Sequence, residues 1–346
     1  MNKEIVEATI KVLDDNPEWQ QVYERYAKEL QDNGKSYEDA GKLFSIQKPL
    51  VVYSKIGSVK DSSNIKLFDL RFAGQSVGEI KVNVKTKQVN LLVNKKQADF
   101  AKDSLGFSDS KELKGKEDWF TGTNAHNFRK FYYGLVSTDR IPIKSPEHRL
   151  ESFLLKEFSK KTRAENKKLC NIQPVRLGDK FFQLTTPLKG STHNPQISII
   201  DNGKGNIGAQ GGGIDILAHI RHEGENYPRL AIIELKDQNI AKEPQVEVME
   251  QALIYATFIA KLLCLTSCGK EWFNIFGFRK DINTLDHIDL DVVSLMPLGS
   301  STEGELSPIE IEGLNVTLHP YTLYFSTDAQ GNPDQFSGTL LEAIKK

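Results

Sequence analysis

The stretch from Gly211 to Lys236 reads GGGIDILAHIRHEGENYPRLAIIELK, and it decides the fold because two of its apolar runs carry charge. Asp215 interrupts the first run, and Glu234 ends the second, two residues before Lys236. Runs of four to eight apolar residues between turn signals are typical of buried strands. Buried strands normally exclude unpaired charge, so these side chains need a chemical reason for their positions.

The spacing of the charged residues indicates where they lie. Side chains alternate across a strand, so Glu234 and Lys236 lie on one face, about 7 Å apart along the strand. If the strand of Asp215 lies beside this one, two carboxylates and one ammonium group converge in an aliphatic pocket. Two such carboxylates repel each other, and one would be protonated unless a cation lay between them. Oxygen ligands suit Mg²⁺ or Mn²⁺, so the pattern predicts a divalent metal site.

Segments with helical periodicity flank the two runs. Upstream, Ser145 and Pro146 form a helix start signal, and the apolar stripe that follows has Glu151 at its edge. The side chain of Glu151 could extend over the sheet and act as a third metal ligand. Glu147, one turn earlier, is the alternative candidate for this ligand. Downstream, a helix opens near Pro244 and runs through Cys264.

On this downstream helix, Gln251 and Tyr255 are four residues apart and so lie on the same side. An amide and a phenol there could hold Lys236 or a substrate phosphate. Each signal alone has a simpler explanation, such as a solvated strand end, a surface ion pair or an ordinary helix face. The case depends on their order and spacing.

A helix with Glu, a strand with Asp, a strand with Glu-x-Lys and a helix with Gln-x-x-x-Tyr follow in this order, which resembles the PD-(D/E)xK nuclease superfamily. The resemblance covers about residues 145–263 and implies a restriction-endonuclease-like core. It implies that Asp215, Glu234 and the helical glutamate bind the metal. It also implies that Lys236 assists the attacking water, while the Gln-x-x-x-Tyr motif matches the exonuclease-like branch.

One feature departs from the family pattern. The proline that gives the family its name is replaced by Gly213 and Ile214 before Asp215, a common departure that leaves the chemistry intact. Glu151 is favoured over Glu147 because the glutamate of the family typically precedes an apolar residue by three positions.

A competing motif lies just upstream. Residues 203–208 read G-x-G-x-x-G and follow a strand-like segment, residues 197–200, as a dinucleotide-binding fingerprint would. However, the glycine-rich residues that follow break helices, so the helix N-terminus that would bind a phosphate is missing. We therefore expect a hairpin loop here.

Composition limits the remaining possibilities. The 346 residues are enough for two domains, and a net charge of −1 gives no global attraction to nucleic acid. Three cysteines and no export signal indicate reduced thiols in a cytoplasmic protein, and no stretch is long and apolar enough for a membrane span. A homodimer and a complex with a partner subunit both fit the sequence.

The first 140 residues resemble no family that we recognise. Residues 41–100 carry ten Lys and one Arg against three Asp and one Glu, a net charge of +7. Lys81, Lys85 and Lys87 crowd the tip of an expected hairpin, where they either track a phosphate backbone or protect an edge strand. The other elements expected in this part are helices over residues 3–13, 17–31, 37–44 and 125–133 and hairpin strands over residues 77–84 and 88–93.

The sequence therefore predicts an α/β protein with a join at residues 137–145. Residues 1–140 form an α+β accessory domain, and residues 141–346 form a restriction-endonuclease-like core with a mixed central sheet flanked by helices. The expected activity is Mg²⁺- or Mn²⁺-dependent hydrolysis of nucleic acid, with DNA as the expected substrate. The alternative is a non-catalytic module that keeps the fold and binds nucleic acid or a protein partner.

Overall fold

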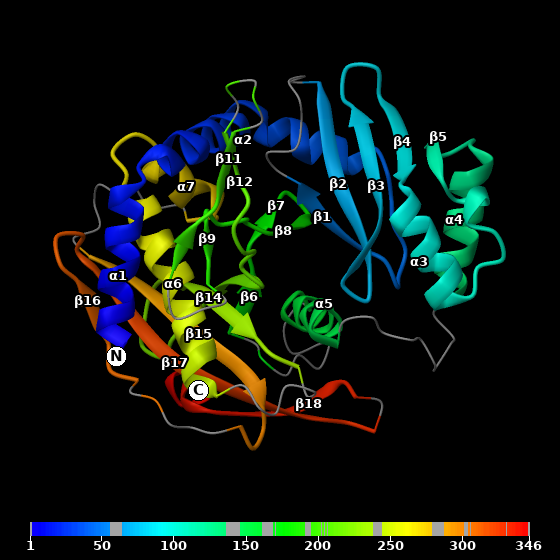
Figure 1. Ribbon diagram of the computed structural model, residues 1–346. Helices are drawn as coiled ribbons and strands as arrows, with labels where there is room; N and C mark the ends of the chain where they lie inside the picture. Colours follow the sequence, from blue (N-terminus) through cyan, green and yellow to red (C-terminus); the bar gives the residue numbers. More distant parts are fainter. Residues whose placement is uncertain are drawn as a thin grey trace. The chain divides into compact units, whose positions relative to one another are not determined.

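The computed structural model describes residues 2–55, 64–135, 146–160, 169, 171–190, 195–201, 203, 205, 207–237, 244–278, 287–300, 304, 306–329 and 331–344. It has a mixed α/β fold, and the chain divides into two compact units. Unit 1 comprises Met1–Gln31, Phe153–Val175 and Gln183–Lys346, and unit 2 comprises Asp32–Ser152 and Arg176–Phe182. Each unit has its own sheet (Figure 1).

The sheet of unit 2 has the strand order β5-β4-β3-β2-β1-β8-β7, antiparallel except for the parallel pair β1 and β8. Its strands are β1 (Val51–Lys55), β2 (Ile65–Phe72), β3 (Gln75–Asn83), β4 (Gln88–Val93), β5 (Gly115–Asp118), β7 (Arg176–Leu177) and β8 (Lys180–Phe182). The helical segments are α3 (Lys95–Leu105), η1 (Ser110–Glu112) and α4 (Thr123–Gly134).

Residues of β2 alternate between buried and half-buried, which is the pattern of a sheet with one face on the core. The expected hairpin is confirmed as β3 and β4, and the side chain of Asn83 closes its turn by accepting from the backbone N–H groups of Lys85 and Thr86. Lys85 and Lys87 are exposed at this tip. The expected helix over residues 125–133 is confirmed as α4.

The larger sheet of unit 1 has the order β16-β17-β15-β14-β13-β6, with β18 on β17. Its strands are β6 (Ile172–Pro174), β13 (Ile216–Ile220), β14 (Arg229–Leu235), β15 (Ile288–Pro297), β16 (Ile309–Ile311), β17 (Val316–Thr327) and β18 (Pro333–Ser337). β14, β15 and β17 are parallel, whereas the other pairings are antiparallel. The sheet is therefore mixed, as expected from the sequence.

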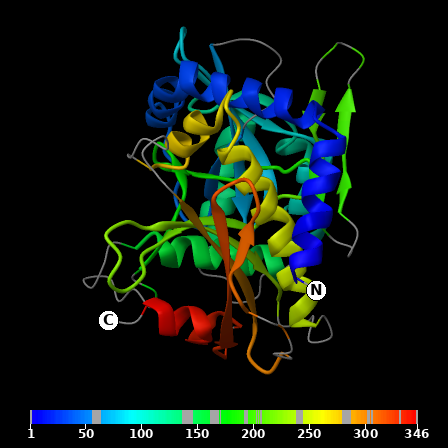
Figure 2. The same ribbon diagram turned by 90° about the vertical axis from the view of Figure 1, so that its left-hand side faces the viewer.

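The parallel centre of this sheet follows from its sequence. β14 and β15 are buried along nearly their whole length, as parallel strands covered on both faces are. Parallel neighbours need a crossover connection, and this one contains α6 (Gln245–Leu263) and α7 (Gly269–Ile275). α6 packs on β14, β15 and β17, with α1 (Asn2–Asp15) beside it (Figures 1 and 2). α8 (Thr339–Ile344) packs on β17 and β18.

The start of the chain belongs to the core of unit 1. Phe258 of α6 packs edge-on against Trp19 and Tyr23, with ring centroids 5.5 and 4.8 Å apart. Both aromatic residues come from α2 (Glu18–Lys42), and Lys261 of α6 pairs with Asp14 of α1 at 2.5 Å. The sequence had instead predicted that these first residues belong to the accessory domain.

The observed units therefore interleave along the chain, in contrast to the single expected boundary at residue 140. The divisions fall inside α2, at residues 31 and 32, and inside α5 (Pro146–Phe158), at residues 152 and 153. α5 begins at Pro146 as expected, whereas the cap at Ser145 and the join over residues 137–145 lie outside the described residues. α2 is also one helix where two were expected.

Shorter strands complete unit 1. They are β9 (Leu188–Lys189), β10 (Gln196–Ile197), β11 (Ile199–Asp201) and β12 (Ile207–Ala209). β11 and β12 pair antiparallel, so the G-x-G-x-x-G segment connects a hairpin, as predicted, with Gly203 and Gly205 in the left-handed region. None of the helices in the described ranges combines the length and apolar character needed to cross a membrane.

Candidate functional site

The two acidic residues predicted from residues 211–236 lie at the same end of an antiparallel strand pair. Ile216 of β13 lies opposite Ile233 of β14, which places Asp215, one residue before β13, next to Glu234. The Oδ2 atom of Asp215 accepts a hydrogen bond from the backbone N–H of Leu235 at 3.1 Å. The strand pairing assumed in the sequence analysis is thereby confirmed.

Lys236 follows the last residue of β14, and it is buried. Its backbone N–H donates to the carbonyl of Leu295 in β15 at 3.0 Å, so the backbone pairing with β15 continues past the end of β14. Alternation along this extended backbone keeps Lys236 on the same face as Glu234. An ammonium group therefore follows the carboxylate pair, two positions along the chain.

Tyr255 connects α6 to the two carboxylates. Its phenol is hydrogen-bonded by the side chain of Gln251, one turn earlier, and by the backbone of Gly190. Burial, together with the negative charges of Glu234 and Asp215, raises the pKa of the Tyr255 phenol to about 12. The phenol is therefore neutral at physiological pH, within electrostatic range of both carboxylates.

Glycines allow the chain to approach Tyr255 closely. A Cβ atom on Gly212 would overlap the Tyr255 hydroxyl, and one on Gly190 would lie 3.1 Å from Cγ of Gln251. A Cβ on Gly211 would overlap backbone atoms of Thr186 and Leu188. From the sequence, the glycine run was interpreted only as a helix breaker. The three consecutive glycines at positions 211–213, which end two residues before Asp215, were the available signal, because such runs permit close backbone packing.

Two polar residues that the sequence did not indicate, one in the sheet and one in α6, lie at the same face of the sheet as Glu234. Ser294 of β15 lies opposite Glu234 in the parallel register, so both side chains lie on one face. Its hydroxyl accepts a hydrogen bond from the side-chain amide of Gln245 at 3.0 Å, and both residues are buried. Gln245 is the first residue of α6, so this bond fixes the start of the helix over the polar face.

Glu151, the predicted third carboxylate, belongs to unit 2 together with Ser152, whereas Asp215 and Glu234 belong to unit 1. Its Oε1 atom accepts a hydrogen bond from the phenol of Tyr53 at 2.9 Å and pairs with Arg71 at 3.4 Å. The guanidinium of Arg71 lies 4.0 Å from the centre of the Tyr53 ring. The structure thus gives the carboxylate of Glu151 two partners within its own unit, and its role as a metal ligand stays a prediction.

The donor atoms that the structure brings together fit a hard divalent cation. Among the described residues, no group of three or more His, Cys, Asp or Glu side chains is arranged to hold a metal ion. Asp215 and Glu234 are a pair of oxygen donors, and Mg²⁺ commonly binds one or two carboxylates while keeping several waters. The carboxylate pair therefore fits Mg²⁺ or Mn²⁺ better than zinc, which prefers nitrogen and sulfur ligands.

Comparison with protein-family models, with curated proteins and with solved structures found no match to this chain. The functional interpretation therefore depends on the residues of this chain and their geometry.

Proposed function

We propose that this protein is a divalent-metal-dependent nuclease that hydrolyses the phosphodiester bonds of DNA. One observation carries the proposal: the register of β13 and β14 places Asp215 next to Glu234, and the hydroxyl of Tyr255 in α6 packs against Gly212, three residues before Asp215. Asp215, Glu234 and Tyr255 were selected from the order and spacing of the sequence motif alone. Their meeting at one place in unit 1 is what a functional motif requires and what unrelated surface residues would rarely produce.

The roles follow from the chemistry of each group. Asp215 and Glu234 would hold the cation, which when bound supplies an activated water and neutralises charge on the phosphate. Lys236 orients the attacking water or stabilises negative charge that develops on the phosphate. We propose that the neutral phenol of Tyr255, held by Gln251 and by the backbone of Gly190, donates a hydrogen bond to a substrate oxygen.

The charge of unit 2 supports a nucleic-acid substrate. Lys85 and Lys87 are exposed at the tip of the β3–β4 hairpin. They belong to residues 41–100, which carry a net charge of +7. Contacts between such lysines and phosphates release counterions, so binding would weaken steeply as salt is raised. We propose that this hairpin tip contributes to binding the substrate backbone.

A second candidate is a non-catalytic module that binds nucleic acid or a protein partner. The absence of a group of three metal-binding side chains among the described residues favours it. Magnesium titration separates the two candidates. A nuclease with a carboxylate pair should be stabilised against heat by Mg²⁺, and Asp215→Asn should abolish this effect, whereas the binding module should show no Mg²⁺-dependent stabilisation.

The proposed function is tested by incubating the full chain with linear, circular and single-stranded DNA and with RNA, in Mg²⁺, Mn²⁺ or chelator. We expect cleavage that needs the metal and falls about 100-fold or more in Lys236→Ala, because a group that stabilises transition-state charge is lost. Lys102→Ala removes an exposed lysine of α3 and should leave the rate unchanged. Equal cleavage by wild type and Lys236→Ala would indicate a contaminating nuclease and contradict the proposal.

A further inference from the structure

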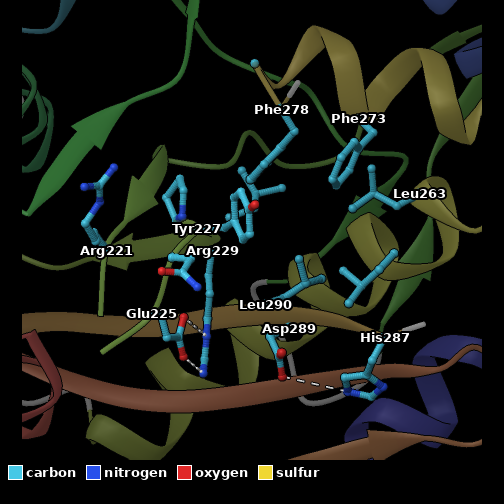
Figure 3. Close-up of a pocket in the computed structure, with 15 residues that line it drawn as sticks. Arg221, Glu225, Tyr227, Arg229, Leu263, Phe273, Phe278, His287, Asp289 and Leu290 are labelled. Carbon is cyan, nitrogen blue, oxygen red and sulfur yellow. Dashed lines mark hydrogen bonds and ion pairs between the residues drawn. The ribbon is translucent and has the colours of Figure 1, made fainter. Parts of the chain in front are cut away.

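A pocket of about 670 Å³ opens in unit 1 at the beginning of β14 and β15 (Figure 3). Arg229 at the start of β14 is among its lining residues, whereas Glu234 lies five residues further along, or about 17 Å by strand rise. The pocket is therefore separate from the candidate nuclease site. Its volume is in the range of small-molecule sites, about 300–1,000 Å³.

One part of the pocket lining is apolar and aromatic. Leu263, Phe273 and Leu290 are buried side chains that reach its surface. The ring of Phe278 stacks on Phe273 with centroids 4.6 Å apart and planes 20° apart. Tyr227, also in the lining, is 56 % exposed, an unusual position for a large aromatic side chain. These surfaces suit a flat ring, because aromatic rings stack and pack edge-on with one another.

The aromatic part of the lining is held in place by His219. Its Nε2 atom donates a hydrogen bond to the carbonyl of Phe276 at 2.5 Å, and its ring packs edge-on against Phe278 at 5.0 Å. Burial lowers the pKa of His219, so it is a neutral partner near pH 7. Gly277 adopts φ +90°, and a Cβ there would lie 3.1 Å from the His219 ring. The loop that presents Phe278 is thus preformed, which lowers the entropic cost of binding.

The charged part of the lining contains two arginines with different roles (Figure 3). Arg229 is engaged by Glu225, through both carboxylate oxygens, and by the buried Asp291 at 3.5 Å. Arg221 is exposed, and with the described residues its guanidinium makes no ion pair. Asp289 in the same lining accepts a hydrogen bond from His319 at 2.6 Å. Arg221 is thus the cation in this lining that is available to an anionic group.

We infer that this pocket binds a small planar aromatic molecule with one anionic group, the ring packing against Phe278 and Tyr227 and the anion pairing with Arg221. An aromatic carboxylate and a nucleoside monophosphate share this chemistry. Arg recognises both carboxylate and phosphate through paired N–H donors. The inference does not depend on the proposed nuclease activity.

The test is calorimetric titration of the full chain with indole-3-carboxylate and with dAMP, each beside its uncharged counterpart, indole or 2′-deoxyadenosine. We expect at least one anion to bind with Kd below about 1 mM and its counterpart to bind at least about tenfold more weakly. Binding of one anion alone identifies which of the two sources the pocket prefers.

Two variants locate the binding. Arg221→Ala, at an exposed position, should remove the preference for the anion, and Arg221→Lys should keep part of it because the charge remains. Phe278→Ala should weaken the charged and uncharged compounds alike. The inference is overturned if neither anion binds with a Kd below about 1 mM, if neither binds at least about tenfold more tightly than its counterpart, or if the preference persists in Arg221→Ala.

Discussion

The surroundings of Glu151 decide what its carboxylate does. A buried carboxylate is costly unless hydrogen bonds or opposite charge compensate for the lost water. Glu151 is 2 % exposed, and the Tyr53 phenol and the Arg71 guanidinium supply this compensation. Burial and the negative charge of Glu151 both hold the pKa of Tyr53 well above its usual range, so Tyr53 stays a hydrogen-bond donor. These contacts indicate a structural role in unit 2.

We therefore predict that Glu151→Gln lowers the stability of unit 2 by about 1–3 kcal/mol, the range for a lost charge-assisted hydrogen bond at a buried site. The measurement is hydrogen exchange of the β1 and β2 amides in urea, beside the Mg²⁺ affinity of the same variant. Asp215→Asn is the comparison that should lower metal affinity. Loss of Mg²⁺ affinity in Glu151→Gln with unchanged amide protection would instead establish Glu151 as the third ligand.

At the scale of elements, two glycines allow the chain to pack closely against Tyr255 of α6. Gly212 lies against the hydroxyl of Tyr255, and Gly190 lies against its ring. The contact sets the position of the phenol that interacts with Asp215 and Glu234. Gly212 and Tyr255 are thus in contact, although β13 and β14 separate them in the sequence.

We predict that Gly212→Ala destabilises unit 1 by about 1–3 kcal/mol and displaces Tyr255, because its methyl group would overlap the phenol. Urea unfolding of the variant gives the size of the effect. Gly208→Ala in β12 is the matched control, since a Cβ there meets nothing within 4 Å. The double variant Gly212→Ala with Tyr255→Phe should regain part of the stability, and no regain would show that the overlap is not the cause.

The sequence predicted elements best where a local signal and burial agree. Pro146 marked the start of α5, and the apolar run before Glu234 became β14. The break expected within α2 was wrong: Asn33 and Gly34 have low helix propensity, but the helix continues through both. Helix propensity is only a weak local signal.

The residues of the candidate site also differ in whether the sequence could predict them. Asp215, Glu234 and Tyr255 could be found because strand alternation and helix periodicity fix which residues share a face. Ser294 could not be found, because its position opposite Glu234 depends on the register between β14 and β15. Glu151 was placed by analogy with a family, and periodicity alone does not reveal that Tyr53 and Arg71 contact it.

At the scale of the whole molecule, neither unit is one continuous segment of the chain. Unit 1 uses Met1–Gln31 to cover α6, and unit 2 takes the short segment Arg176–Phe182 into its sheet beside β1. The indole N–H of Trp272 donates to the carbonyl of Tyr23 at 3.1 Å, which adds a buried hydrogen bond to the aromatic contacts of Phe258. A fragment cut at the boundary expected from the sequence would lose these partners.

We therefore predict that the fragment comprising residues 141–346 does not fold cooperatively. Removal of Trp19 and Tyr23 exposes the buried rings of Phe258 and Trp272, and the loss of even one large aromatic from a core costs about 3–5 kcal/mol, a large fraction of typical domain stability. The fragment should bind a hydrophobic dye and show no sharp thermal transition. A peptide of residues 1–31 added in trans should restore part of the transition, whereas the same peptide with Trp19→Ala should restore less. A fragment that unfolds cooperatively without the peptide would contradict the division into interleaved units.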